Sequence, residues 1–355
     1  MDRLVKTLSE TVSGLERTLG LDWRTSYVNI VPAESGRIVL EVSRREVVNE
    51  LLDGLEGFSI HRSTPGTVEL VSDSAGTVEV RLLGSGGETS LWVISSVADL
   101  RRVPDHSGEL LSQVIMGEEL RLLKGAGDWY LVRLRDDYHG WVRSWYLSEV
   151  SPATVRRYSR EAGRMVRANV AYVLSDPDPS SLPVSDIVSG TRIVALERAG
   201  AFRRVALPGG KEGFIREEDL GDPPPGKPDR DRLVGRAKRF LGIPYLWGGT
   251  SAKGFDCSGL VQRVFRMEGV ELPRDSDMQS ASGRPIGRDA IRTTRPGDLL
   301  FFGKTGSIDH VSICLKPDGF IHAYGDVRIG SLDPRDGNYE EKLAESLLFA
   351  RSILA

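Results

Sequence analysis

The strongest constraint on the fold is an internal repeat in the middle of the chain. Each repeated residue is separated from its partner by the same 73 positions, as Gly117 is from Gly190, and no gap interrupts the match. The matched residues are Gly117, Gly127, Trp129, Val132, Gly140, Trp141 and Leu147 with Gly190, Gly200, Phe202, Val205, Gly213, Phe214 and Leu220. Both copies alternate strand-like runs with glycine turns, which predicts two small closed β-barrels.

The length of 355 residues exceeds that of one ordinary domain. The stiff segment Gly221-Asp222-Pro223-Pro224-Pro225-Gly226-Lys227-Pro228 cannot continue a strand and is predicted to end the barrels. The predicted fold class is therefore multidomain α+β. We expect an N-terminal α+β domain at 1–87, barrels at 92–152 and 160–222, and a C-terminal α+β domain at 230–355.

The N-terminal segment shows helical and strand periodicity but no residues typical of a chemical site. Helices are predicted at 3–19 and 45–55, and strands at 27–31, 38–42, 67–71 and 77–83. The flexible Gly84-Ser85-Gly86-Gly87 closes the segment. A packing or spacing role is expected for it.

Composition and charge narrow the partners that this chain can have. Hydrophobic residues make up 40% and charged residues 27%, as in soluble globular proteins, and the net charge is only −3. Both signs of charge are interspersed, without the concentrated basic surface that nucleic acids require. No stretch approaches the roughly 20 apolar residues that span a bilayer. We therefore expect neither nucleic acid nor membrane as a partner, and the oligomeric state is left open.

The cysteine count and the start of the chain suggest an intracellular protein. The two cysteines, Cys257 and Cys314, are too few for a disulfide framework and suit a reducing compartment. No apolar run follows a basic start, so no signal peptide is recognised. If Met1 is the natural start, a cytoplasmic location is expected. A secreted or envelope protein whose leader was removed is the alternative.

Cys257 is the strongest candidate for chemistry. It follows a glycine-rich loop, Gly248 to Gly254, and Asp256 before it is a good helix N-cap. Apolar residues then recur with helical period, which places Cys257 in the first turn of a helix. There the unpaired N–H groups and the helix dipole favour the thiolate that a nucleophile must be. A small buried residue, the alternative, fits poorly with the polar neighbours on either side.

A nucleophilic cysteine needs a base, normally histidine, and the base needs a polar group that orients it. His310 and His322 lie on successive predicted strands joined by the turn Pro317-Asp318-Gly319. A simple hairpin would leave the two histidines several residues out of register, so a twist or bulge is required to pair them. Ordinary surface roles suffice for the other three histidines.

Cys257, His310 and His322 could also ligate zinc. However, a fourth ligand at a recognisable spacing and a Cys-x-x-Cys motif are both missing from the sequence. Nucleophilic catalysis is the better interpretation, with no metal or cofactor expected. Cys314 lies in the strand-like run Val311–Leu315 and is expected to pack in the core.

These segments resemble the NlpC family of papain-like cell-wall cysteine peptidases. The matching motifs follow the family's order and are VGRAKRFLGIPYLWGG, FDCSGLVQRVF, LPRDSDMQ, RPGDLLFF, DHVSICL and GFIHAYG. The resemblance implies a papain-like α+β domain with Cys257 as the nucleophile, His310 as the base and His322 as the orienting residue. All three have the expected residue type, which argues against an inactive copy.

The resemblance also implies a substrate and its contacts. The family typically cuts the γ-D-glutamyl to diamino-acid bond of bacterial cell-wall peptides. The positions that match its substrate-contacting residues are Tyr245, Asp256, Ser258 and Ser276. The competing roles are a helix N-cap for Asp256 and a turn residue for Ser276. Arg274 is expected to brace the loop that contains Ser276.

The first repeat, in GDWYLVRLRDDYHGWVRSWYL, resembles the bacterial SH3-like domain. The second copy has fewer aromatic residues, so a structural role is expected for it. Two such barrels before the peptidase resemble the subgroup that trims released muropeptides, in which the first barrel walls off the cleft. An acidic residue and a tyrosine there receive the free amine of L-Ala, and the best matches are Glu109 and Tyr146. A surface glutamate and a barrel-packing tyrosine are the alternatives.

The function implied is hydrolysis of the γ-D-glutamyl-diamino acid bond in peptidoglycan-derived peptides with free N-terminal L-Ala, as in muropeptide recycling. His310 would take the Cys257 proton, and the backbone N–H of Cys257 would serve as an oxyanion donor. The alternatives are a secreted hydrolase of intact peptidoglycan, a non-catalytic wall-binding protein, and an acyltransferase or amidase acting on another acyl group. The sequence leaves open whether the diamino acid is diaminopimelate or lysine.

Overall fold

The computed structural model describes residues 2–33, 37–55, 58–72, 76–85 and 89–354. The chain divides into two compact units, Met1–Leu91 with Glu119–Ser144 and Trp92–Glu118 with Trp145–Ala355. The predicted end of the N-terminal domain at residue 87 lies outside the described residues. None of the helices in the described ranges is long and apolar enough to cross a membrane.

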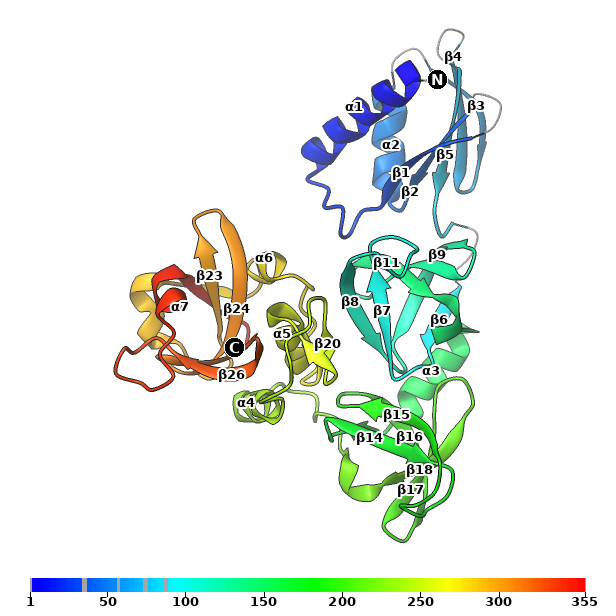
Figure 1. Ribbon diagram of the computed structural model, residues 1–355. Coiled ribbons are helices and arrows are strands. Elements are labelled where there is room, and N and C mark those ends of the chain that lie inside the picture. The colour runs from blue at the N-terminus through cyan, green and yellow to red at the C-terminus, as the bar shows by residue number, and fades with distance from the viewer. Residues whose placement is uncertain (1, 34–36, 56–57, 73–75, 86–88, 355) are drawn as a thin grey trace. The chain divides into compact units, whose positions relative to one another are not determined.

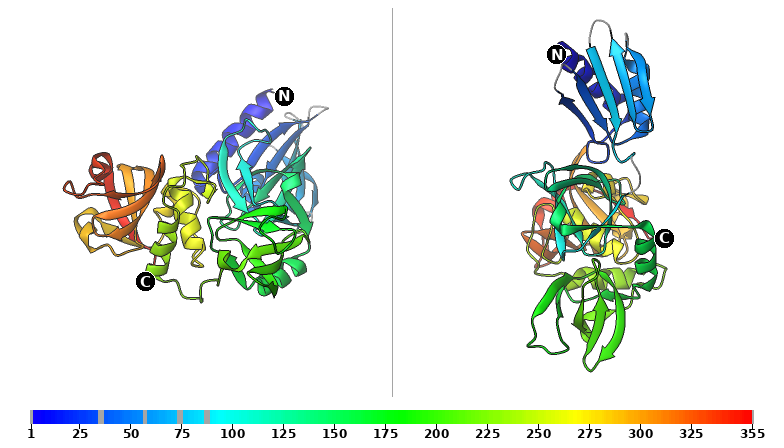
Figure 2. Two further views of the ribbon diagram at one scale, coloured as in Figure 1. Left: turned by 60° about the horizontal axis from the view of Figure 1, so that its bottom comes forward. Right: turned by 90° about the vertical axis from the view of Figure 1, so that its right-hand side faces the viewer.

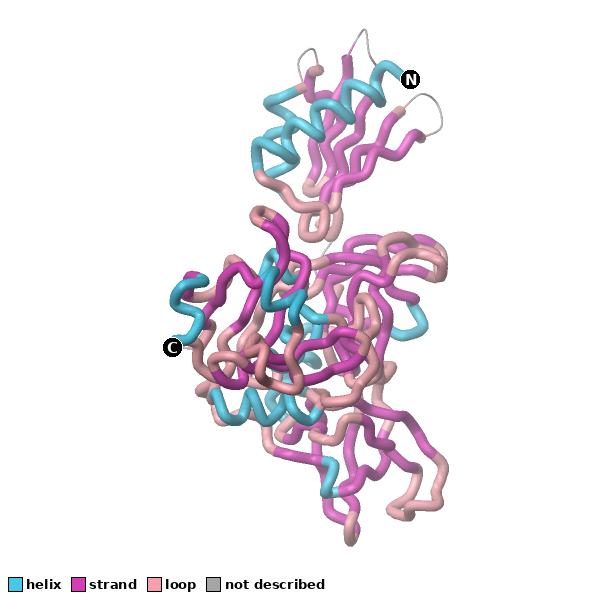
Figure 3. Tube along the Cα trace, turned by 60° about the vertical axis from the view of Figure 1, so that its left-hand side comes forward, coloured by secondary structure: helices cyan, strands magenta, loops and turns pink. Residues whose placement is uncertain are grey.

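The N-terminal part of the first unit is a five-stranded sheet with two helices on one face (Figures 1 and 3). Its elements are α1 (Asp2–Leu19), β1 (Val28–Pro32), β2 (Ile38–Val42), α2 (Arg45–Gly54), β3 (Ser59–Thr64), β4 (Thr67–Ser72) and β5 (Gly76–Leu82). The strand order is β1-β2-β5-β4-β3, with β2 and β5 parallel. Leu4, Leu8 and Val12 of α1 are buried because residues four apart share one helix face. The two helices and four of the strands confirm the sequence prediction.

The strand β3 was not predicted. All six of its residues are exposed, and its sequence Ser59-Ile60-His61-Arg62-Ser63-Thr64 is almost entirely polar. It lies at the edge of the sheet and pairs with β4 alone. Such a strand is stabilised by its hydrogen bonds to the neighbouring strand. Its own sequence shows no apolar alternation from which it could be predicted.

The internal repeat is confirmed by element boundaries that recur 73 positions apart. The matched elements are β9 (Glu119–Ala126) with β16 (Arg192–Ala199), β10 (Trp129–Arg133) with β17 (Phe202–Ala206), β11 (His139–Arg143) with β18 (Glu212–Arg216), and the turns Ser144–Tyr146 with Glu217–Asp219. Gly117 and Gly190 both have positive φ, 85° and 90°, at equivalent turns. Glycine is favoured there because other residues are strained in this conformation.

The remaining strands complete the two repeats. They are β6 (Ser90–Val93), β7 (Val97–Arg101), β8 (Leu110–Ile115) and β12 (Leu147–Val150) in the first, and β13 (Arg164–Val166), β14 (Val170–Leu174), β15 (Pro183–Val188) and β19 (Leu220–Gly221) in the second. The sheet of the second repeat has the order β15-β14-β18-β17-β16-β13-β19. Between the repeats lies α3 (Pro152–Glu161), whose N-cap Ser151 accepts a hydrogen bond from the Thr154 N–H.

The C-terminal part of the second unit is a six-stranded sheet packed against helices (Figure 2). Its helices are α4 (Arg230–Arg239), α5 (Cys257–Arg266), α6 (Ser276–Gln279), the 3₁₀ segment Arg288–Thr293 and α7 (Glu341–Ser346). Its strands are the short β20 (Thr250–Ser251) and β21 (Gly254–Phe255), and β22 (Arg284–Gly287), β23 (Leu299–Lys304), β24 (Ser307–Lys316), β25 (Gly319–Tyr324), β26 (Asp326–Ser331) and β27 (Leu347–Ser352). The six-stranded order is β22-β27-β23-β24-β25-β26.

The two faces of this sheet carry separate cores. Leu260 and Val264 of α5 and Leu233 of α4 pack with Val311 and Ile313 of β24 on one face. Leu300, Phe302, Phe320 and Cys314 pack on the other face. Both faces of the sheet are therefore buried, and α5 is buried along most of its length. The prediction that Cys314 packs in the core is confirmed.

Candidate active site

Cys257 is the first residue of α5, and Asp256 is its N-cap, as predicted. The Asp256 carboxylate accepts hydrogen bonds from the N–H groups of Gly259, at 2.7 Å, and Gly248, at 2.9 Å. It thereby joins the glycine-rich loop to the first turn of the helix. Both positions require glycine, for different reasons. A Cβ on Gly259 would lie 2.1 Å from the Gly249 carbonyl oxygen. Gly248 has a positive φ of 75°, which strains other residues.

The surroundings of Cys257 favour a neutral thiol and not the thiolate that was expected at a helix start. Burial raises the pKa of the thiol to about 12, and the Asp256 carboxylate acts in the same direction. Backbone N–H groups of Val311 and Ser258 donate to the sulfur and act in the opposite direction. Burial outweighs the helix terminus, so the resting group is a neutral thiol that needs a base before it can attack.

His310 and His322 form a direct hydrogen bond, Nε2 to Nδ1, at 2.9 Å. The bulge that the sequence required lies between Cys314 and Lys316 of β24. It shifts the register from Lys316–Gly319 to Cys314–Phe320 and Ile313–Ile321, which places the two histidines on the same face of the sheet. The predicted pairing of the histidines is therefore confirmed, with the bulge as its cause.

Burial lowers the pKa of both imidazoles. That of His310 falls to about 3, with His322 as the second cause, and that of His322 falls to about 4. Both rings are therefore neutral near pH 7. Val311, whose N–H reaches the Cys257 sulfur, is the residue after His310, so the neutral thiol and the neutral imidazole pair belong to one site.

A fourth residue, Glu340, completes this arrangement and was not predicted from the sequence. Its Oε1 atom lies 2.9 Å from Nε2 of His322. Glu340 follows the loop after β26, 18 positions from His322 in the chain. No motif or periodic spacing marks it, because the loop between them is irregular.

Comparison with known proteins defines two segments of the chain. Residues 242–346 match the NlpC/P60 family, and residues 100–145 match the bacterial dipeptidyl-peptidase SH3 domain. Residues 242–346 thus form an NlpC/P60 domain. The multidomain α+β class predicted from the sequence is confirmed by the same matches and by the sheets described above.

Relatives of the chain match it over much of its length. The gamma-D-glutamyl-L-lysine dipeptidyl-peptidase of Bacillus cereus is 29% identical over 258 residues, which cover 65% of this chain and 72% of the relative. Dipeptidyl-peptidase 6 of Lysinibacillus sphaericus is 27% identical, and the match covers 74% of this chain and 98% of the relative. A crystal structure of an NlpC/P60 family protein from Bacillus cereus has a TM-score of 0.64 at 24% identity, covering 75% of this chain and all of that one. The chain is thus a hydrolase related to peptidoglycan peptidases, with a shared fold.

Arg274 forms a buried ion pair in the NlpC/P60 site, whereas the sequence predicted only that it braces the loop containing Ser276. It is 1% exposed, and its guanidinium binds both carboxylate oxygens of Asp256, at 2.5 and 3.1 Å. It also donates to the hydroxyls of Ser258, at 2.8 Å, and Ser112, at 3.0 Å. Asp256 is therefore both N-cap and partner of a buried cation, and its contact with substrate stays a prediction.

Two of the other predicted substrate residues, Tyr245 and Ser258, lie beside Cys257. Burial, followed by the nearby Cys257 and Asp256, raises the pKa of Tyr245 to about 12. Ser258 is buried in the first turn of α5, and its carbonyl accepts from Gln279 of α6 at 3.0 Å. Ser276 begins α6 and is partly buried. The structure thus brings Tyr245 and Ser258 to Cys257, and it places Ser276 on the helix whose Gln279 binds Ser258. Contact with substrate stays a prediction for all three residues.

Glu109 also reaches this site, within the second unit. Its Oε1 accepts from the Trp247 indole at 3.1 Å, and Trp247 directly precedes Gly248, which binds Asp256. Its other oxygen accepts from Arg102 at 2.7 Å. Tyr146 packs edge to face on Trp145. In the described part of the chain, no hydrogen bond or ring contact joins Tyr146 to the loop before Cys257.

A buried ion cluster holds strand β8 and its following turn to α5. Glu118 accepts from Arg263 and from Arg266, both at 3.0 Å. Burial alone would raise the pKa of the Glu118 carboxyl, but the charges of the two arginines outweigh it, and the pKa lies below its ordinary 4.5. The cluster therefore stabilises the fold most when Glu118 is ionised.

This cluster predicts a pH dependence of stability. Because the folded pKa of Glu118 is depressed, its contribution is complete above pH 4.5 and is lost as the pH falls through the folded pKa. Urea unfolding between about pH 6 and pH 3 measures the loss. We expect a shallower decline below pH 4.5 in Glu118→Gln than in the wild type. Equal declines would contradict the assignment.

Proposed function

We propose that this peptidase hydrolyses the γ-D-glutamyl bond to a diamino acid in peptidoglycan-derived peptides that carry a free N-terminal L-Ala. The observation that supports it is the position of Glu109, an exposed carboxylate bonded to Trp247 in the loop that leads to Cys257. A carboxylate at that place offers an acceptor for a substrate ammonium group. Two relatives, from Bacillus cereus and Bacillus subtilis, are gamma-D-glutamyl-L-lysine dipeptidyl-peptidases, which agrees with this substrate class.

The proposed mechanism is acyl transfer through the thiol. His310 accepts the proton of Cys257 as the sulfur attacks the γ-glutamyl carbonyl carbon. The neutral thiol and the neutral imidazole therefore become charged only during the reaction. The C–N bond breaks, and the imidazolium of His310 protonates the leaving amine. Water, with His310 as the base, then attacks the thioester carbonyl carbon, the C–S bond breaks, and Cys257 regains its proton. The acyl product leaves second, with a new carboxylate. The backbone N–H of Cys257, in the first turn of α5, is the proposed oxyanion donor.

Substrate contacts are proposed for the remaining residues of the site. Tyr245 and Ser258 lie beside Cys257, and Ser276 begins the neighbouring helix α6. All three are proposed to offer hydroxyl groups to the D-Glu α-carboxylate. Tyr146 is proposed as a second partner of the amine beside Glu109. A released peptide is a substrate found inside the cell, and the two free thiols, Cys257 and Cys314, suit a reducing compartment, so we propose a cytoplasmic location.

The substrate proposal is tested with two peptides that differ only at the amino end. L-Ala-γ-D-Glu-diaminopimelate and its N-acetylated form are compared by mass spectrometry, with the lysine peptide as a third substrate. We expect N-acetylation to lower kcat/KM by at least about 10-fold, because Glu109 loses a charged partner. Glu109→Gln should remove most of this preference. The matched control Glu149→Gln changes an exposed glutamate on β12 and should keep it.

Each outcome of this comparison separates the candidate functions. Equal cutting of both peptides would reject the amine requirement and favour a hydrolase of intact peptidoglycan. Binding without any turnover by the wild type would favour a wall-binding protein. Turnover of other acyl groups alone would favour an acyltransferase or amidase.

A further inference from the structure

A continuous chain of hydrogen bonds runs from His310 through His322 to Glu340. His310 Nε2 lies 2.9 Å from His322 Nδ1, and His322 Nε2 lies 2.9 Å from Glu340 Oε1. His322 is fully buried, and both of its ring nitrogens are used in these two bonds. The proton positions along the chain are therefore set by the group at its end.

A carboxylate at the end of the chain determines the tautomer of both rings. An ionised Glu340 accepts hydrogen bonds and cannot donate, so Nε2 of His322 must carry its proton. Nδ1 of His322 is then an acceptor, and Nε2 of His310 must donate to it. The remaining nitrogen, Nδ1 of His310, keeps its lone pair and is available for the thiol of Cys257.

We propose that Glu340 is a positioning residue for hydrolysis, which holds His322 in the tautomer that leaves Nδ1 of His310 free as the base. This inference rests on the proposed roles of Cys257 and His310. Glu340 touches neither the sulfur nor the substrate in this scheme. It acts through His322 alone, in the way that a buried carboxylate orients the histidine of a hydrolytic triad.

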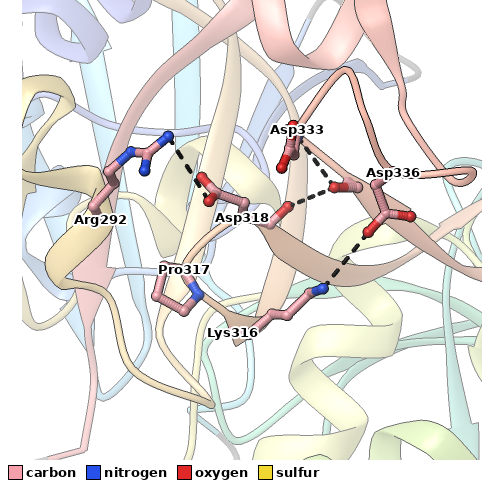
Figure 4. A pocket seen from close by; sticks show the side chains of 7 residues that line it. Arg292, Lys316, Pro317, Asp318, Asp333 and Asp336 are labelled. Carbon is pink, nitrogen blue, oxygen red and sulfur yellow. Dashed lines mark hydrogen bonds and ion pairs between the residues drawn. The ribbon is translucent and has the colours of Figure 1, made fainter.

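The loop that carries Glu340 is anchored at several points. The Glu340 N–H donates to the Ser331 carbonyl at 3.0 Å, and the Ser331 N–H donates to the Asn338 carbonyl at 2.8 Å. Figure 4 shows a pocket beside this loop, where Lys316 and Asp336 pair at 3.6 Å. These contacts fix the backbone of Glu340 beside β26, so its carboxylate reaches His322 without first having to become ordered.

Counting protons predicts how acid affects the site. Each of the two hydrogen bonds in the chain holds one proton. A third proton goes either to Nδ1 of His310, where it removes the base, or to the carboxylate of Glu340, where it releases the constraint on the tautomers. Arg328 and Asp326 are the charged groups around His322 and Glu340, and burial raises the pKa of Glu340 against the opposing charge of Arg328. Because burial lowers the pKa of His310 to about 3, the acid limb of activity should lie below the ordinary 6.5 of a histidine.

The test compares Glu340→Ala and Glu340→Gln with the matched control Glu341→Ala, an exposed glutamate at the start of α7. We expect kcat/KM to fall roughly 10- to 100-fold in Glu340→Ala and to stay within about 2-fold in the control. The side chain of Glu340 is 24% exposed, so added formate should reach the vacated position. Formate should raise the activity of Glu340→Ala several-fold and leave the wild type unchanged. The Gln variant, whose amide can donate or accept, should lie between the two.

A second readout is independent of the substrate. Alkylation of Cys257 by iodoacetamide, located by peptide mass spectrometry, should slow in Glu340→Ala by a similar factor and recover with formate. If the substrate proposal is wrong, alkylation still shows this effect while peptide turnover is absent in all variants. An alkylation rate in Glu340→Ala equal to that of the wild type, a loss without formate rescue in a folded variant, or an equal loss in Glu341→Ala would each overturn the role of Glu340.

Discussion

Replacing Cys257 by alanine is expected to lower peptide hydrolysis by about 10⁴-fold or more. The variant removes the atom that attacks the carbonyl, and the proposed mechanism offers the histidine pair no other nucleophile. The fold should be unaffected, because Cys257 is only partly buried and the cap of α5 is formed by Asp256. Mass-spectrometric detection of the released L-Ala-γ-D-Glu, with substrate in excess, measures the loss.

The second cysteine provides the matched control. Cys314 lies on the same strand as His310 but packs with Phe302 and Phe320, and its sulfur contacts Thr294 at 3.5 Å. Cys314→Ala should keep hydrolysis within about 2-fold and lower the unfolding free energy by roughly 1–2 kcal/mol through the lost packing. Substantial turnover by Cys257→Ala, or loss of turnover in Cys314→Ala alone, would remove Cys257 from the mechanism.

Replacing Arg274 by methionine is expected to destabilise the protein by roughly 3–5 kcal/mol, because it leaves the Asp256 carboxylate buried without its cation. Arg274 is 1% exposed and Asp256 is 7% exposed, so solvent cannot replace the lost partner. Urea unfolding near neutral pH measures the change. Hydrolysis should fall as well, because Asp256 caps the helix that begins with Cys257.

Two further variants separate the ion pair from simple packing. Arg284→Met changes an exposed arginine on β22 and should alter stability by less than about 0.5 kcal/mol. The double variant Asp256→Asn/Arg274→Met removes both charges and should recover part of the lost stability, since no unpaired charge is then buried. A double variant less stable than Arg274→Met would instead show that the N-cap carboxylate matters more than the pair.

The protonation states at the site favour general-base attack over a resting ion pair. Burial raises the pKa of Cys257 and lowers that of His310, so the neutral forms of both groups are preferred before substrate binds. Burial at a helix start thus reverses the effect that the helix terminus alone would have. The hydrogen-bond chain from His310 to Glu340 supplies what such a mechanism needs, because it leaves a lone pair on Nδ1 of His310.

The sequence alone determined the features that depend on local patterns. The repeat was visible because equivalent turns need glycine, as at Gly117 and Gly190, and its 73-residue spacing recurs in the strand boundaries. The start of α5 was visible because a capping residue and helical periodicity are properties of neighbouring residues. The candidate nucleophile and histidines followed from residue type and motif order.

Only the tertiary structure decided how these residues meet. A single bulge near Cys314 places His310 and His322 on one face, and strand register of this kind is set by packing across the sheet. Glu340 reaches His322 from an irregular loop, and Arg274 joins Asp256 to Ser112, which lies 162 positions from Arg274 in the chain. Such contacts form because buried charges and polar groups must find partners wherever the fold provides them. No local pattern in the sequence records that requirement.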